Sequence, residues 1–182
     1  MPFAIVLTFD EKNTRMIEKV LKKFKETEIS PLMYEEKIKP HITLAIYDEI
    51  NSDVAKDRLI LFSIENPQFI IQISSIGYFP SEESVIFLNP KANIALLSIQ
   101  EKIFRLFKDF ESNHFPETWV PHCTLGMYIQ KENISRAIDI IKEEIIMTKE
   151  KPFYVTAKAL SLVKFQEDPL RINWWLDYNL KE

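Results

Sequence analysis

The chain has 182 residues, of which 46% are hydrophobic and 27% charged, a balance that is typical of one globular domain. Gly77 and Gly126 are its only glycines, which excludes a glycine-rich phosphate loop, because such a loop needs several backbone positions without a Cβ. The formal net charge of -4 at pH 7 argues against a broad footprint on duplex nucleic acid, so a small substrate or one nucleic-acid end fits better.

The first half of the chain predicts strands and helices in alternation. Short runs rich in β-branched and aromatic residues predict strands at residues 3–9, 40–47 and 69–79. A first helix is predicted after Asn13 and Thr14, its candidate N-caps, because the apolar residues that follow have helical spacing: Ile17, Val20, Leu21 and Phe24. A second helix is predicted over residues 51–63, with Asn51 at its start.

The second half repeats this order. After a turn at residues 80–83, a strand is predicted at 84–89 and a helix at 93–111. The segment "PHCTLGMY" (121–128) predicts the next strand, and Asn133 is the candidate cap of the helix that follows it. The last two strands are predicted at residues 152–165 and 171–178.

Two segments match closely between the halves, "KPHITLAIYD" (39–48) and "VPHCTLGMYI" (120–129). A shift of 122 minus 41, or 81 residues, aligns three notable pairs: Ile5 with Ile86, Leu7 with Leu88, and His41 with His122. A shift of 84 residues aligns Phe69 with Phe153. Since no low-complexity linker separates the halves, we expect residues 1–182 to form a single domain made of two internally repeated lobes.

The two matched strands each predict one polar and one apolar face. Alternation with period two places these residues on the polar faces: His41, Thr43, Ala45 and Tyr47, then His122, Thr124, Gly126 and Tyr128. We expect the small residue in each set to clear space for a hollow that the histidine and threonine border. Cys123 falls on the apolar face, which favours a core residue over a nucleophile or metal ligand. His114 has no partner motif, and we expect no role for it.

Two histidines that face one substrate suit general acid–base chemistry. Neutral imidazole accepts a proton and imidazolium donates one, and both forms are accessible near neutral pH. Threonine hydroxyls can donate hydrogen bonds to oxygens that gain charge in the transition state. This set of groups suits a phosphodiester. In such a substrate one oxygen atom attacks phosphorus while another leaves, and two anionic non-bridging oxygens lie between them.

The paired H-x-T-L blocks resemble the 2H phosphoesterase superfamily, and "FAIVLTFDEKNTRMIEKVLKKF" and "IKPHITLAIYDEI" are similar to its 2'-5' RNA ligase-like proteins. The resemblance implies an α+β, pseudo-twofold, two-lobed fold, with two antiparallel sheets lining a central cleft and helices packed outside. It implies metal-free chemistry, without a cofactor, on 2'-5' or 2',3'-cyclic ribose phosphodiesters. His41 with Thr43 would form one catalytic arm, and His122 with Thr124 the other; which histidine is the base stays open.

Further residues are candidates for substrate binding. Tyr47 and Tyr128 follow from strand alternation alone, and Arg171 can reach a phosphate, although a surface arginine is the commoner case. Trp174 and Trp175 point to opposite faces, so that one can stack on a base while the other fills the core. Lys37 and Lys39 lie in the same short segment as His41 and can attract an anion near it. That both lysines are simply solvated is the simpler expectation.

The expected partners are an RNA end or a small nucleotide phosphodiester, with neither a membrane nor an extended nucleic-acid duplex. A single cysteine excludes a disulfide framework, and the run "MPFAIVLTFDEK" lacks the basic start of a signal peptide. No apolar stretch approaches the ~20 residues of a membrane span. We expect a cytoplasmic monomer.

Two other functions compete with this hypothesis. A module that binds a nucleotide or RNA end without turnover would need the same cleft. A metal hydrolase is disfavoured, because threonine is not a normal zinc ligand and the sequence contains no HExxH motif. Ligation is the reverse of 2'-5' cleavage on the same residues, and the sequence does not say which direction matters in the cell.

Overall fold

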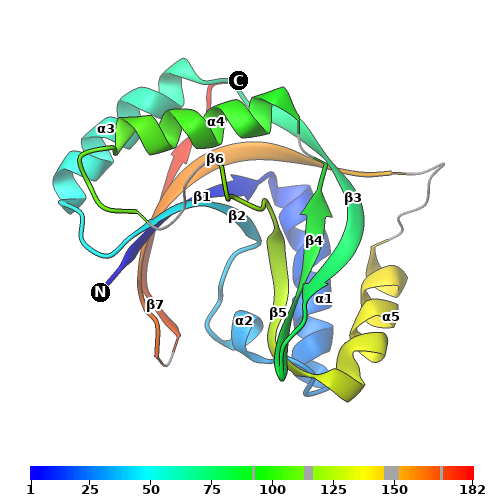
Figure 1. The fold of residues 1–182 in the computed structure, drawn as a ribbon. Helices are drawn as coiled ribbons and strands as arrows, with labels where there is room; N and C mark the ends of the chain where they lie inside the picture. The colour runs from blue at the N-terminus through cyan, green and yellow to red at the C-terminus, as the bar shows by residue number, and fades with distance from the viewer. Residues whose placement is uncertain (92, 113–116, 146–151, 169) are drawn as a thin grey trace.

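The computed structural model describes residues 1–91, 93–112, 117–145, 152–168 and 170–182, so that His114 lies outside the described residues. Seven strands lie within this part of the chain: β1 (Phe3–Phe9), β2 (His41–Tyr47), β3 (Phe69–Phe79), β4 (Glu83–Pro90), β5 (Cys123–Gln130), β6 (Phe153–Gln166) and β7 (Arg171–Asn179). The helices described are α1 (Glu11–Glu26), α2 (Leu32–Glu35), α3 (Ser52–Glu65), α4 (Ile94–Leu106) and α5 (Ile134–Glu144), with a 3-10 turn at Lys131–Asn133. These elements confirm the α+β class (Figure 1).

The predicted elements are confirmed in type, and the helix ends differ for local reasons. Asp10 is the N-cap of α1, since its side chain accepts a hydrogen bond from the Asn13 backbone N–H, so this helix begins before the predicted caps. Asn51 caps α3 as predicted. The 3-10 turn leads directly into α5, so the backbone of Asn133 is already helical. A residue that caps a helix with its side chain normally has an extended backbone. α4 ends at Leu106, short of the predicted residue 111.

The strands form one antiparallel sheet in the order β2-β1-β6-β3-β4-β5, and β7 also pairs with β6. Ile71 of β3 pairs with Val155 of β6, and 155 minus 71 is the same 84-residue shift that relates the halves of the sequence. Adding 84 to the number of a β3 residue gives a residue of β6, and this shift maps the pairs between the two strands onto one another. A pseudo-twofold axis that passes through the pair Ile71 and Val155 produces this arrangement. The two sheets that we expected are therefore one continuous sheet, because β3 and β6 are hydrogen-bonded to each other.

A β-bulge interrupts β2 and β5 at equivalent positions. Ile5 pairs with Ala45 but Val6 with Thr43, which leaves Leu44 as the extra residue. In the other half Ile86 pairs with Gly126 but Phe87 with Thr124, which leaves Leu125 as the extra residue. The five positions named in one half correspond to the five in the other under the 81-residue shift.

Each bulge reverses the alternation of faces for the residues that follow it. The prediction that Ala45 and Gly126 clear space beside the histidines is therefore wrong. Ala45 is fully buried in the main core, and a Cβ at Gly126 would lie 3.1 Å from Phe24 of α1. Both positions are small because a helix packs closely against the strand.

The helices of one half cover the matched strand of the other half. α1 packs against β5 and α5, and α4 packs against β2. β2 and β5 are the two ends of the sheet order, so part of their backbone needs partners from outside the sheet. Gln100 of α4 donates to the Leu44 carbonyl, and the Ser30 hydroxyl donates to the Met127 carbonyl (2.8 Å) and accepts from the Met127 N–H (2.9 Å).

Replacing Gly126 by valine tests this packing. The added atoms would press on Ile129, Phe24 and Ser30, so we expect the free energy of unfolding in urea to fall by about 1–3 kcal/mol. Gln130→Val is the matched control, because Gln130 is exposed on the same strand and its replacement should change stability by less than about 0.5 kcal/mol. Equal stability of Gly126→Val and the unmodified chain would show that this position does not face the helix.

Candidate active site

The two histidines are held by the same hydrogen bond. Nδ1 of His41 lies 2.7 Å from the Lys39 carbonyl oxygen, and Nδ1 of His122 lies 2.8 Å from the Val120 carbonyl oxygen. A carbonyl oxygen only accepts, so Nδ1 of each ring carries the hydrogen and donates it. In the neutral form of either histidine, Nε2 is then the nitrogen that can take a proton.

The proline of each P-H-x-T block helps to form this hydrogen bond. Proline disfavours helical geometry in the residue before it, so we expect an extended backbone at Lys39 and Val120. The carbonyl that accepts from the ring belongs to the residue before the proline in both halves. The residues before β2 and β5 therefore fix the tautomer and the orientation of each imidazole.

Aromatic rings flank both histidines. Trp175 meets the ring of His41 edge-on, with centroids 5.5 Å apart. Phe79 meets the ring of His122 edge-on at 5.2 Å, and Phe87 lies at 5.3 Å from it. These contacts limit the rotation of each imidazole.

The two imidazoles lie close enough to influence each other electrostatically. Burial lowers the pKa of His41 to about 4, and positive charge on His122 lowers it further, against the effect of the Lys39 carbonyl. β2 and β5 also contact each other directly. The fold thus brings residues 41 and 122 from opposite halves of the chain to one place.

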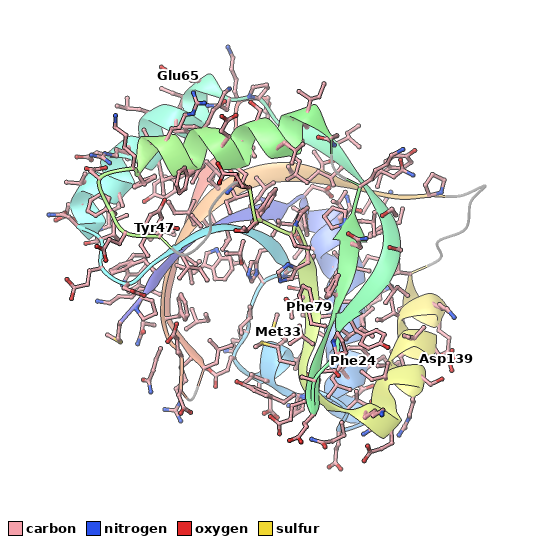
Figure 2. The ribbon with its side chains drawn as sticks, viewed as in Figure 1. Phe24, Met33, Tyr47, Glu65, Phe79 and Asp139 are labelled. Carbon is pink, nitrogen blue, oxygen red and sulfur yellow. The ribbon has the colours of Figure 1, made fainter. Side chains whose placement is uncertain are left out.

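A pocket of about 200 Å³ lies at this place, and His41, Thr43 and Thr124 line it. The structure thus brings three of the four predicted residues together, and His122 is not among the residues that line this pocket. Met33 of α2 also lines the pocket (Figure 2). Cys123 is buried as predicted, on the other face of β5.

Tyr47 does not join the pocket, so the prediction that it shares a face with His41 is wrong. The bulge at Leu44 turns Ile46 into the pocket and Tyr47 into the core, where it is 1% exposed. Its ring packs on Phe107 and Phe110, and burial raises the pKa of its hydroxyl. Among the residues that the structure describes, the Tyr47 hydroxyl has no hydrogen-bond partner.

The other two candidate binding residues lie outside the pocket. Tyr128 follows the bulge of β5, has a positive φ of 58°, and is 51% exposed. Arg171 is exposed, while the next residue along β7, Ile172, lines the pocket. Alternation along the strand therefore directs the Arg171 side chain away from the pocket.

The sequence pattern could not tell which of the two neighbouring tryptophans, Trp174 or Trp175, would face the pocket. Trp174 packs edge-on against Phe3, whereas Trp175 lines the pocket. Asp177 fixes Trp175 by accepting a hydrogen bond from its indole N–H at 2.7 Å. The two tryptophans do face opposite sides, and contacts with Phe3 and His41 decide which is which.

Asp177 also determines what Lys39 can do. The Lys39 ammonium lies 2.6 Å from Asp177, and the Ser161 hydroxyl donates to the same carboxylate at 2.6 Å. Partial burial opposes ionisation, but the hydrogen bonds from Lys39 and Ser161 leave the pKa of Asp177 lowered. Lys39 is therefore paired, rather than a free cation beside His41.

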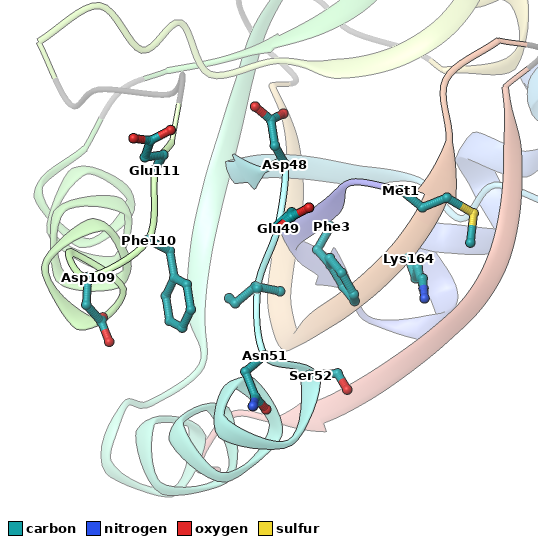
Figure 3. Close-up of a pocket in the computed structure, with 11 residues that line it drawn as sticks. Met1, Phe3, Asp48, Glu49, Asn51, Ser52, Asp109, Phe110, Glu111 and Lys164 are labelled. Carbon is teal, nitrogen blue, oxygen red and sulfur yellow. The ribbon is translucent and has the colours of Figure 1, made fainter.

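A larger hollow, of about 870 Å³, lies away from the histidines (Figure 3). Four of the side chains that line it are carboxylates: Asp48, Glu49, Asp109 and Glu111. A phosphate would be repelled there. Size alone therefore does not identify the site, and the pocket beside His41 suits an anionic reaction centre better.

Within the described residues, no three His, Cys, Asp or Glu side chains are grouped as metal ligands would be. None of the described helices is both long enough and apolar enough to cross a lipid bilayer.

Comparison with known proteins identifies relatives of the chain. The model of the 2'-5' RNA ligase superfamily matches residues 14–169, which confirms the resemblance seen in the paired motifs. A search of curated proteins finds no match.

Several solved structures share the fold. E. coli LigT in its apo form is 15% identical, with a TM-score of 0.62 over 100% of this chain and 98% of that one. TT0787 of Thermus thermophilus is 14% identical, with a TM-score of 0.60 over 100% of both chains. Usb1 of Kluyveromyces marxianus is 12% identical, with a TM-score of 0.52 over 98% of both chains.

The lowered pKa of His41 predicts an unusual titration. Followed by NMR of the imidazole protons, His41 should stay neutral until the pH falls to about 4. The unfolded chain binds this proton near pH 6.5, so the His41 contribution to stability is complete above pH ~6.5 and is lost as the pH falls toward about 4.

His122→Ala is the informative variant for this titration. It removes a neighbouring positive charge, so the pKa of His41 should rise. A midpoint for His41 near its ordinary value in the unmodified protein would show that its partial burial does not lower the pKa.

Proposed function

The chain belongs to the 2'-5' RNA ligase superfamily, and we propose on that premise that it is a metal-independent phosphoesterase of the 2H type. Its substrates would be 2',3'-cyclic or 2'-5' ribose phosphodiesters, at RNA ends or in nucleotides. The observation that supports this best is the matched placement of two histidines, each donating from Nδ1 to a backbone carbonyl, in two strands whose threonines line one pocket.

His41 is the proposed general base for hydrolysis of a cyclic phosphate. Its lowered pKa keeps the ring neutral at pH 7, and Nε2 is the nitrogen that can accept a proton. Nε2 takes a proton from water as the water oxygen attacks phosphorus. His122 donates a proton to the ribose oxygen as its bond to phosphorus breaks, and both histidines then exchange protons with solvent.

Thr43 and Thr124 are the proposed ligands of the phosphate. Both line the pocket, one from each half, and each hydroxyl can donate to a non-bridging oxygen. Such donors contribute most when charge builds on those oxygens in the transition state. Ligation would use the same residues in reverse, with a hydroxyl of a second ribose opening the cyclic phosphate.

Structures of LigT support a ligand of nucleotide size. LigT has been solved with 3'-AMP and with phosphate, at TM-scores of 0.59 and 0.53 to this chain. It has also been solved with ATP and with NADP+. We propose that this chain binds such a ligand with its phosphate between His41 and His122.

Substitution of the histidines tests the proposal. Purified protein is assayed on 2',3'-cyclic nucleotides and on RNA that ends in a 2',3'-cyclic phosphate, with and without chelator. His41→Ala and His122→Ala should each lower kcat by ~10²–10⁴, because each removes one proton-transfer group. The rate should depend on pH as a bell, since one histidine must be neutral and the other charged.

Thr43→Val and Thr124→Val remove a hydroxyl at nearly constant shape, and each should lower kcat by ~10²-fold. Thr27→Val is the control, since the Thr27 hydroxyl is exposed and bonds the Lys23 carbonyl at the end of α1. Tight nucleotide binding with no turnover of any substrate would favour a binding module instead. Activity that disappears with chelator and returns with metal would contradict the metal-independent mechanism.

A further inference from the structure

The two histidines use the carbonyls of very different residues. His41 donates from Nδ1 to Lys39, and His122 donates to Val120, at positions related by the 81-residue shift. Val120 is 54% exposed, and its side chain can form neither a hydrogen bond nor an ion pair. Lys39 carries an ammonium group that another residue can hold. The hydrogen bond of His41 can therefore be supported by a side chain in a way that the hydrogen bond of His122 cannot.

Asp177 of β7 binds this ammonium group and is itself held in place. Its Oδ2 lies 2.6 Å from Nζ of Lys39, while its Oδ1 accepts from the Ser161 hydroxyl at 2.6 Å and from the Trp175 indole N–H at 2.7 Å. Asp177 lies directly opposite Ser161, which is fully buried in β6. β6 pairs with β1 on its other side, so the carboxylate is fixed to the interior of the sheet (Figure 1).

Two of the groups that Asp177 binds also contact His41. Lys39 supplies the carbonyl for Nδ1, and Trp175 meets the imidazole edge-on with ring centroids 5.5 Å apart. The Lys39 ammonium also lies over the Trp175 ring, 5.3 Å from its centroid. Asp177, Lys39 and Trp175 therefore all contact one another, and two of the three limit how the His41 ring can lie.

The ion pair between Lys39 and Asp177 is not explained by stability. Each side chain is 43% exposed, and ion pairs at such positions contribute little to the free energy of unfolding. What distinguishes this pair is that one carboxylate accepts from three donors, one of which is a buried hydroxyl. Such a carboxylate orients its neighbours. It also neutralises the Lys39 ammonium, whose free positive charge would oppose proton uptake by His41.

We propose that Asp177 is a positioning residue for His41: by holding Lys39 and Trp175, it keeps Nδ1–H on the Lys39 carbonyl and leaves Nε2 free to take the proton. The inference rests on the proposed function, in which His41 is the general base, and adds a residue of the C-terminal strand to it. Asp177 is not among the described residues that line the pocket. It therefore acts through His41 and not on the substrate.

Two substitutions of Asp177 test this role in steady-state kinetics on a 2',3'-cyclic nucleotide. Asp177→Asn keeps an oxygen for Ser161 and Trp175 but turns an amide NH2 group toward the Lys39 ammonium, and it should lower kcat ~10-fold. Asp177→Ala removes all of these contacts and should lower kcat ~10–100-fold, because a small displacement of a reacting group is costly. The KM should change by less than ~3-fold in both variants, since Asp177 does not contact the substrate.

A background without His41 separates positioning from a general loss of structure. In His41→Ala protein, Asp177→Ala should lower the residual rate by no more than ~2-fold, because the group through which it acts is absent. In His122→Ala protein it should keep its full effect. A full loss in the His41→Ala background would overturn the inference and leave the phosphoesterase assignment intact.

Lys39→Met removes the other partner of the ion pair. It should lower kcat as Asp177→Asn does, and the double variant should be no worse than either single variant. Glu101→Gln is the matched control, because it makes the same change of charge in an exposed ion pair with Arg105 on α4, and it should leave kcat unchanged. A Lys39→Met protein with a raised KM and an unchanged kcat would identify Lys39 as a substrate ligand and overturn the inference.

The tautomer of His41 gives a measurement that needs no turnover. Nitrogen NMR at pH ~7 should show the neutral ring with its hydrogen on Nδ1. In Asp177→Ala a second form, with the hydrogen on Nε2, should appear because the Lys39 carbonyl is no longer held, while the signals of His122 should not change. This result in a protein without turnover would support the positioning role and reject the phosphoesterase. An unchanged tautomer of His41 would reject the positioning role in an active protein as well.

Discussion

The bulge that the two matched strands share at equivalent positions, Leu44 in β2 and Leu125 in β5, controls what the faces of these strands present. Before the bulge, His41 and Thr43 of β2 and Thr124 of β5 face the pocket. After it, Ile46 and Met127 do, while Ala45 and Gly126 turn to the helices. Each strand thereby carries reactive groups and an apolar wall side by side, which strict alternation would have put on opposite faces.

The position of these strands at the two ends of the sheet order links the halves of the molecule. Their backbone groups take partners from elements outside the sheet: Gln100 bonds Leu44, the Trp119 indole donates to the Thr43 carbonyl at 2.9 Å, and Ser30 bonds Met127. Gln100 and Trp119 belong to the second half of the sequence, and Ser30 to the first. Neither of the two matched strands has all of its backbone partners without the other half, so folding and assembly of the pocket occur together.

The sequence predicted the parts of this site that depend on local pattern. His41, Thr43 and Thr124 share a pocket because alternation holds over the first three residues of each motif. Tyr47 was misplaced because no residue type marks the extra Leu44, and the bulge is visible only in the pairing of β1 with β2. Trp174 and Trp175 were indistinguishable because their difference lies in contacts with Phe3 and His41, which are far apart in sequence.

The halves correspond at the histidines, and the surroundings of the histidines break this symmetry. Each ring donates to the carbonyl two residues before it, yet Trp175 of β7 stands beside His41 while Phe79 of the β3–β4 hairpin stands beside His122. Burial disfavours the charged form of His41. In the proposed reaction one histidine accepts a proton and the other donates one, and the burial of His41 suits it to the role of acceptor. The repeated motif supplies the two imidazoles, and the C-terminal strand, which breaks the repeat, makes their surroundings unequal.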